Sequence, residues 1–325
     1  MENQKSLVSI IIPVYNSEKT IRKCLDSILC QTFKDFTVYI INDGSTDNSS
    51  SILNEYNKLT NIKVINQSNL GVSAARNRAL DMIHSKFVTF IDSDDYVNPK
   101  FLEHLVEGFA DNDVDLVTTG VTYISDEGIL LQKSKYKSGI YDSNKMLSYV
   151  LEEGGPQGYL CNKLFKTKII QKNNIRLDYD IYMAEDLVFC VQYILYANKI
   201  NILKSRDYFY VQFKNSLSHQ VKNNNIEAYK NYMLALNKIK KIIPNQYKQP
   251  FVNIRGRICR LNCDIIRNLN LNRYDGLLMK EAKCEAKRYR KYLFKSTDVN
   301  NKKICSYYIT IYFPWLMKEF DKKYK

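Results

Sequence analysis

The feature that most constrains the fold is the alternation of short apolar runs with helical patterns in the first two thirds of the chain. The runs are rich in β-branched and aromatic residues, which is typical of buried strands. Strands that are joined through helices pair in parallel, and helices then cover both faces of the sheet. The sequence therefore predicts an α/β domain with a mostly parallel sheet. The expected strands are Ser9–Val14, Phe36–Ile41, Ile62–Ile65, the run that ends at Ile91, and Val114–Thr122.

Polar residues follow several of these strands at the point where the strand ends. Asn16 follows the first strand and Asp43 the second, and Asp92, Asp94 and Asp95 follow the fourth. Ligands of parallel sheets bind at the carboxyl ends of the strands, so we expect these side chains to meet at one edge. The glycine patterns GxGxxG and GxxxxGK[ST] are absent. An ordinary dinucleotide-binding or P-loop protein is therefore excluded.

The three clustered aspartates need either a cation or a role in a turn. Two carboxylates about 5 Å apart repel by roughly 3 kcal/mol at an effective dielectric constant of about 20, and a divalent cation would offset this. Capping of the next helix, expected to run to about Ala110, is already supplied by Asn98 and Pro99. A calcium loop is excluded because Tyr96 and Val97 stand where it needs an oxygen ligand and a glycine. The residues alone leave a metal site and an acidic turn open.

The net charge of +14 is distributed unevenly along the chain. Residues 1–219 carry 24 lysines and arginines against 26 acidic residues, whereas residues 220–325 carry 24 against 8. We therefore expect one domain over 1–219 and a basic, tyrosine-rich, mainly helical region over 220–325, in which SYYITIYF is the one strand-like run. A solvated bundle, an anionic membrane surface and a homo-oligomer contact remain open as its role. No nucleic-acid partner is expected, because no binding motif accompanies the charge.

The cysteines and the hydropathy pattern bear on the compartment. The eight cysteines are scattered and form no CxxC pair, which is typical of a reduced protein. No apolar run reaches the 18 residues that a membrane span needs, and the first residues lead directly into a strand. We therefore expect no signal peptide and a cytoplasmic protein, with peripheral binding at the inner face of the plasma membrane as the alternative.

Five motifs in order, SIIIPVYNSE, INDGSTDNS, NLGVSAARNRAL, FIDSDD and AEDLVF, extend over roughly residues 6–220. In these motifs the chain resembles the inverting nucleotide-sugar glycosyltransferases of family 2, which have the GT-A fold. The resemblance implies that residues 1–219 are a catalytic domain. It implies transfer of a hexose or N-acetylhexosamine from a nucleotide diphosphate donor, expected to be UDP, to an acceptor hydroxyl. The acceptor would be a glycan, a lipid-linked molecule or a protein, in the synthesis of cell-surface polysaccharide, teichoic-type polymer or glycoprotein. The alternative function is that of a catalytically silent scaffold in a glycan synthesis complex.

The resemblance also implies roles for residues in the first four motifs. Asp43 would accept the uracil imide N–H, and Arg76 would pack near the base and Asp43. Asp92 would contact ribose or metal, Asp94 would bind the metal that bridges the diphosphate, and Asp95 would bond to the donor sugar. The metal would be Mn²⁺ or Mg²⁺, held by Asp94, Asp92 and His219. The full expected donor-binding set is Pro13, Tyr15, Asn16, Asp43, Arg76, Asp92, Asp95 and Lys163.

The fifth motif carries the expected catalytic residues, Glu185 and Asp186. An acceptor hydroxyl must lose its proton as it attacks, and the resemblance implies that Asp186 is the general base. From the residues alone, an acidic first turn of the following apolar helix is the alternative. The sequence departs from the family after the strand expected at Asp207–Gln212, because Val211 stands where the family often has an arginine near the diphosphate.

Overall fold

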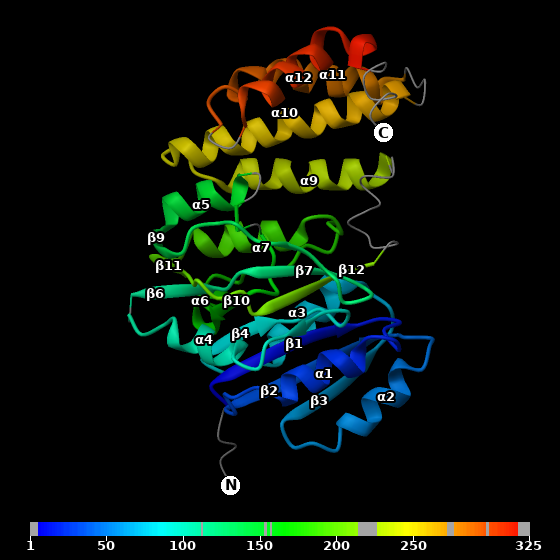
Figure 1. Cartoon of the computed structure of the whole chain (residues 1–325), viewed down its shortest axis with the longest axis vertical. Helices are drawn as coiled ribbons and strands as arrows, with labels where there is room; N and C mark the ends of the chain where they lie inside the picture. The colour runs from blue at the N-terminus through cyan, green and yellow to red at the C-terminus, as the bar shows by residue number, and fades with distance from the viewer. Residues whose placement is uncertain are drawn as a thin grey trace. The chain divides into compact units, whose positions relative to one another are not determined.

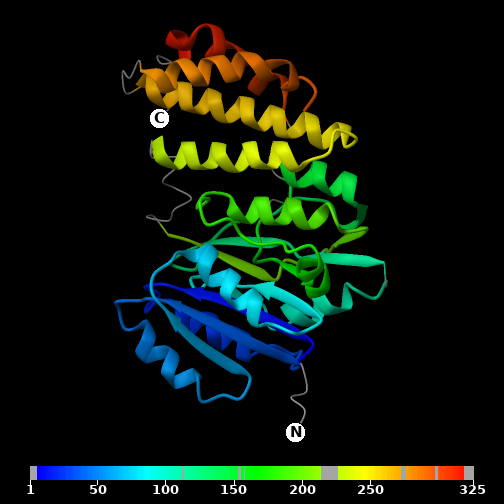
Figure 2. The ribbon, with the colours of Figure 1, turned by 180° about the vertical axis from the view of Figure 1, so that it is seen from behind.

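The computed structural model describes residues 6–111, 113–152, 155–156, 158–213, 226–271, 276–296 and 299–317 (Figures 1 and 2). The chain divides into two compact units. The first comprises Met1–Met146 with Gly158–Phe213, and the second comprises Leu147–Gln157 with Lys214–Lys325. His219, expected as a metal ligand, lies outside the described residues.

The first unit is built on an eight-stranded sheet with the order β3-β2-β1-β4-β10-β6-β11-β9. Strands β3, β2, β1 and β4 are parallel, β10 is antiparallel to both of its neighbours, β6 and β11 are parallel, and β9 is antiparallel to β11. The predicted α/β fold is confirmed. The strands are β1 (Val8–Val14), β2 (Phe36–Asp43), β3 (Ile62–Gln67), β4 (Phe87–Phe90), β6 (Val114–Thr118), β9 (Gly139–Asp142), β10 (Lys163–Lys166) and β11 (Lys199–Ile202).

Strand β1 is the centre of the parallel half because it is apolar on both faces. All its residues are buried, and it pairs with β2 on one side and β4 on the other. Ile10 and Ile12 join a buried cluster with side chains of α1 (Ile21–Leu29), α2 (Ser49–Tyr56) and α4 (Phe101–Glu107). Helix α3 (Val72–Met82) packs against β1 and β2 from the other face, which Figure 2 shows in cyan. The carboxyl ends of the parallel strands therefore meet at one edge between two helical layers.

A second sheet has the order β5-β12-β7-β8. Its strands are β5 (Tyr96–Val97), β7 (Val121–Ser125), β8 (Leu130–Lys133) and β12 (Tyr208–Gln212). The single strand expected over Val114–Thr122 is wrong, because β6 and β7 belong to different sheets. The break falls at Thr119 and Gly120, whose N–H groups leave the ladders and donate to Asn162 O and Ser205 O at 3.0 and 2.8 Å.

The first unit also contains α6 (Thr167–Lys172) and α7 (Glu185–Ile194), and the division between the two units falls within α5 (Ser143–Leu151). The helix expected to begin at Pro99 and run to about Ala110 is α4, which begins two residues later and ends at Glu107. Asn98 was expected as its N-cap, but Lys100 is the residue that directly precedes the helix. Asn98 Oδ1 instead accepts from Lys100 N at 3.0 Å, and its carbonyl accepts from Phe101 N.

The second unit is helical. It contains α9 (Ile226–Ile242), α10 (Lys248–Leu271), α11 (Leu277–Tyr289), a 3₁₀ turn (Arg290–Tyr292) and α12 (Asn301–Tyr312). Helix α10 buries Ile254, Ile258 and Ile265 and packs against α9, α11 and α12. The strand-like run SYYITIYF lies mainly in α12, where Asn300 Oδ1 caps the helix by accepting from Lys303 N. None of the described helices is long and apolar enough to cross a membrane.

Candidate active site

The loop that follows β4 carries the three aspartates and is anchored by a tyrosine of β12. Tyr208 Oη donates to Asp95 Oδ2 at 2.6 Å and accepts from Asp92 N at 3.2 Å. Val211 N donates to Asp95 Oδ1 at 2.8 Å. Both oxygens of Asp95 therefore hold the loop against β12. The expected bond from Asp95 to the donor sugar stays a prediction. Tyr208 was not singled out from the sequence as an anchor of this loop. Its position in the aromatic run YFYVQ was the only sequence signal that could have pointed to it.

Arg76 connects this loop to the start of α7. Its Nη2 donates to Asp92 Oδ1 at 2.7 Å and its Nη1 to Glu185 Oε1 at 2.9 Å. Burial works against the charge of Arg76, but Asp92 and Glu185 more than offset it, and the pKa of Arg76 is raised. The structure thus places Arg76 between the two acidic motifs. Its expected place near the base and Asp43 stays a prediction.

Asp43 holds the loop that leads into α3. Its Oδ1 accepts from Gln67 Nε2 at 2.7 Å and from Leu70 N at 2.9 Å, and its Oδ2 accepts from Gly71 N at 2.8 Å. The next residue, Gly44, has φ +71°, and a Cβ there would lie 2.7 Å from Asn69 N. Only glycine fits this turn without strain. Asp43 keeps one oxygen with a single partner among the described residues, so it can accept a further bond.

The residues after β1 form the neighbouring part of the edge. Asn16 has φ +49°, its Oδ1 accepts from Thr46 N at 2.8 Å, and its N donates to Ser45 Oγ at 3.1 Å. Asn16 therefore ties the loop after β1 to the loop after β2. Tyr15 is 48% exposed, so its ring is open to a ligand, whereas Pro13 is buried within the sheet.

Glu185 and Asp186 form the first turn of α7. The helix follows Ala184, which has the left-handed φ of +64°. Burial, and next the charge of Glu185, raise the pKa of Asp186 to about 7. Asp186 Oδ1 accepts from Leu187 N at 2.7 Å. A carboxyl group with a pKa near neutrality can both take and release a proton at the working pH, as a general base requires.

Lys163 lies beneath this pair and is fully buried. Its Nζ donates to Tyr159 O at 2.6 Å and to Asn162 Oδ1 at 2.9 Å. Burial lowers the pKa of Lys163, and its charge partly opposes the rise in the pKa of Asp186. Lys163 therefore acts on Asp186 from the protein interior.

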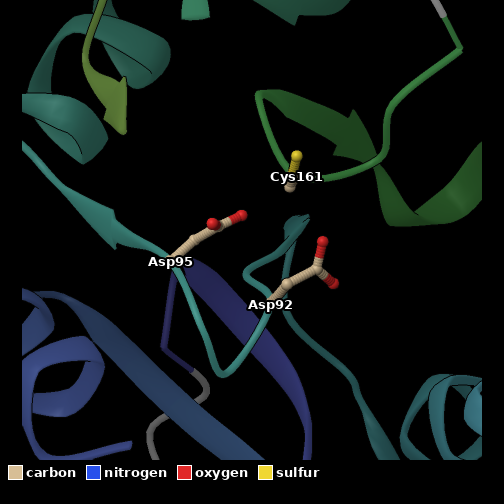
Figure 3. A group of neighbouring side chains, drawn as sticks. All are labelled: Asp92, Asp95 and Cys161. Carbon is tan, nitrogen blue, oxygen red and sulfur yellow. The ribbon is translucent and has the colours of Figure 1, made fainter. Parts of the chain in front are cut away.

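The residues available to a metal ion lie in and beside the aspartate loop. Asp92, Asp95 and Cys161 have potential ligand atoms within 4.8 Å of one another (Figure 3). Burial raises the pKa of the Cys161 thiol, and a protonated, soft sulfur does not suit Mg²⁺ or Mn²⁺. Asp94 is the more suitable oxygen ligand beside Asp92, because it is exposed at the edge of the loop.

The raised pKa of Asp94 supports Asp94 as a metal ligand. Loss of hydration, and next the charge of Asp92, raise the pKa of Asp94 to about 6, and water on its open side screens part of this shift. A cation would remove the repulsion. On α3, the buried atoms Ser73 Oγ and Arg76 Nε have no hydrogen-bond partner among the described residues. A buried polar atom without a partner costs about 1–3 kcal/mol, so these atoms also favour a bound ligand. The oxygen donors present fit a hard divalent cation.

An acidic loop at the carboxyl edge of a mixed α/β sheet, bridged by Arg76 to an acidic helix start, is the arrangement expected from the resemblance to GT-A sugar transferases. A profile of the family described as "Glycosyl transferase family 2" matches residues 9–172. The chain belongs to glycosyltransferase family 2, and the resemblance found in its five motifs is confirmed.

Curated relatives are glycosyltransferases of bacteria. Poly(ribitol-phosphate) beta-glucosyltransferase of Bacillus spizizenii is 35% identical over 209 residues, 63% of this chain and 32% of that protein. Poly(ribitol-phosphate) beta-N-acetylglucosaminyltransferase TarS of Staphylococcus aureus is 29% identical over 206 residues, 62% of this chain and 35% of that protein. The chain therefore aligns with about a third of the length of these relatives.

Solved structures show the same fold. The structure of S. aureus TarS 1-349 in complex with UDP-GlcNAc has a TM-score of 0.61 at 22% identity and covers 88% of this chain and 90% of that one. The mannosyltransferase PcManGT from Pyrobaculum calidifontis, in complex with GDP-Man and Mn²⁺, has a TM-score of 0.57 at 14% identity and covers 98% and 89%.

Proposed function

We propose that the protein transfers a hexose or N-acetylhexosamine from a UDP-sugar to a hydroxyl group of an acceptor polymer, with inversion and with help from a divalent cation. The observation that carries the proposal is Arg76, which bonds to Asp92 of the aspartate loop and to Glu185 beside Asp186. It holds the proposed donor site and the proposed base as one unit.

The chemistry assigned to the chain is a single displacement. Asp186 accepts the proton of the attacking hydroxyl, and its pKa of about 7 leaves much of it unprotonated at neutral pH. Attack from the face opposite the leaving diphosphate inverts the anomeric centre. A cation bound by Asp94 and Asp92 would offset the charge that builds on the diphosphate.

The donor assignment rests on the carboxyl edge and on the relatives. Asp43 has an oxygen that can accept the uracil imide N–H, and the exposed ring of Tyr15 can stack on the base. Asn16 joins the two loops that border them. A solved relative binds UDP-GlcNAc, and the two poly(ribitol-phosphate) transferases act on a polymer. An acceptor of cell-envelope type follows from that likeness.

The test uses the whole chain with UDP-glucose, UDP-GlcNAc, UDP-galactose and GDP-mannose, each with Mn²⁺ or with EDTA. Slow hydrolysis of one UDP-sugar in Mn²⁺, absent in EDTA, is expected. Asp186→Asn is the control, since it should bind the same donor with little turnover. Donor binding without hydrolysis or transfer would favour the silent scaffold instead, and full activity in EDTA would contradict the metal.

We further assign residues 1–219 to catalysis and residues 220–325 to a separate helical region in the cytoplasm, at the inner face of the membrane. All eight cysteines are free thiols, which favours a reducing compartment. Exposed apolar side chains gather at the end of α12, where Lys287 Nζ lies over the ring of Tyr312. They are Ile309, Tyr312, Phe313, Trp315 and Leu316.

Aromatic and basic side chains together suit an anionic bilayer surface. Flotation of the whole chain with anionic vesicles at low salt, and not with neutral vesicles, is the expected result. Absence from the anionic vesicles, together with a dimer in solution, would instead favour a homo-oligomer contact.

A further inference from the structure

A polar cavity of about 220 Å³ lies in the first unit, away from the aspartate loop. It forms where the chain passes from β6 to β7 and from β11 to β12, beside the segment that follows β8. Its volume is below the roughly 300–1,000 Å³ of sites for drug-sized ligands, so it suits one small group. The hydroxyl and cationic side chains that line it are Ser134, Tyr136, Ser138, Lys204, Ser205 and Arg206.

Both charged residues that line this polar cavity, Lys204 and Arg206, are cationic. None of its lining residues is acidic, and Lys204 and Arg206 are both exposed. Within the described part of the chain, Lys204 has no hydrogen-bond or ion-pair partner. Lys133 and Lys135 are exposed on the segment beside Ser134 and add to the field. The cavity therefore attracts an anion.

Arg206 is held in a position that suits a phosphate group. Its Nε donates to Ser134 O at 3.0 Å, which sets the plane of the guanidinium and leaves its two terminal nitrogens for a ligand. Its stem packs on Gly120, where a Cβ would lie 2.5 Å from Arg206 Cγ and 2.9 Å from Ser134 Oγ. A fixed guanidinium fork matches two oxygens of a phosphate, and the nearby lysine and the Ser138 hydroxyl can bind the remaining oxygens.

Two short connections join the polar cavity to the candidate active site. Arg206 precedes Tyr208, the anchor of the aspartate loop, by two residues, which is about 7 Å of extended chain. Asn162 Nδ2 donates to Tyr136 Oη at 3.2 Å, and Asn162 follows Cys161 beside the same loop. Strands β6 and β11 end at the cavity, so it lies on the carboxyl side of the sheet, as the aspartate loop does.

We propose that the polar cavity binds a phosphate group of an anionic acceptor polymer while a hydroxyl elsewhere on that polymer reaches Asp186. This inference rests on the proposed function, and it narrows the acceptor to a polymer with phosphodiester groups. Inorganic phosphate presents the same oxygens, so it serves as a probe of the cavity that is independent of catalysis.

The test compares two double variants that each remove two positive charges. Lys204→Ala with Arg206→Ala removes the cations of the cavity, and Lys168→Ala with Lys172→Ala removes two exposed cations of α6. Phosphate binding is measured by ³¹P NMR titration. Transfer is measured with a poly(glycerol phosphate) acceptor and with a neutral glycan, and the KM values of donor and acceptor are determined separately.

The cavity variant should lose at least 10-fold in phosphate affinity and gain at least 10-fold in KM for the phosphate polymer, with an unchanged KM for the donor. The α6 variant should match the wild type. Equal phosphate binding by the two variants would overturn the site. Phosphate binding lost from the cavity variant with an unchanged KM for the polymer would overturn its role toward the acceptor, leaving a site for free phosphate. Failure of the proposed function would show differently, as absence of donor hydrolysis in the wild type.

Discussion

Tyr208→Phe should loosen the aspartate loop while leaving the core filled. The hydroxyl that it removes is buried, donates to Asp95 Oδ2 and accepts from Asp92 N. Each such bond contributes about 1 kcal/mol net, so the variant should lose about 2 kcal/mol of unfolding free energy. For a unit of this size, that lowers the melting temperature by about 4–8 °C. A displacement of the loop by about 1 Å should also reduce the rate of transfer up to about 100-fold.

The assay is thermal melting together with donor hydrolysis in Mn²⁺. Tyr96→Phe is the matched control, because Tyr96 lies on β5 and stacks on Phe209 of the same sheet, and among the described residues its hydroxyl has no hydrogen-bond partner. We expect Tyr96→Phe to melt and react as the wild type does. If Tyr208→Phe also melts within 1 °C or so of the wild type, the anchoring argument is wrong.

Three further changes test the site. Asp94→Ala should leave the metal-free protein as stable as the wild type or more stable above pH 6, because repulsion with Asp92 is relieved. It should abolish the stabilisation by Mn²⁺, which is about 2.7 kcal/mol at an Mn²⁺ concentration of 100 times the Kd. Melting temperatures with and without Mn²⁺ measure this, and an undiminished shift by Mn²⁺ in the variant would refute the metal assignment. Asp186→Asn should reduce turnover about 10²- to 10⁴-fold with donor affinity retained, and wild-type turnover should fall below pH 7. Because folded Asp186 binds its proton more tightly than the unfolded chain does, wild-type stability should fall as pH rises from about 4 to about 7. The Asn variant should show a shallower slope, because Asp94, whose pKa is also raised, still contributes to it. Gly44→Ala should lower the free energy of unfolding, measured in urea, by about 1–2 kcal/mol of backbone strain or more, because its Cβ would also clash with Asn69 N. Gly128→Ala is the control: it has φ +84° and open space around it, so it should cost only the backbone strain.

The parallel half of the sheet was predictable because its strands carry their own signal. Val8–Val14 is apolar except for Ser9, and a short, β-branched run of this kind is typical of a strand covered on both faces. The polar residue after each strand was likewise sufficient to predict one common edge, because parallel strands all point the same way.

The rest depended on contacts that no local pattern encodes. The division at Thr119 and Gly120 comes from bonds to Asn162 and Ser205, which are 43 or more residues away, so VDLVTTGVT read as one strand. Arg76 was placed beside Asp43 by analogy, and only the packed structure shows its bonds to Asp92 and Glu185. The run SYYITIYF has strand propensity, but packing against α10 makes it a helix.

The late position of β10 in the chain has a consequence for synthesis and folding. Lys163–Lys166 pairs with β4 on one side and β6 on the other, so the two halves of the sheet share no backbone ladder until this strand has arrived. Until then one edge of β4 (Phe87–Phe90) has no partner strand, and an open apolar edge is a template for pairing with other chains. A nascent chain that pauses before residue 163 would therefore be at its most aggregation-prone, and its solubility would depend on chaperones that cover this edge during those seconds.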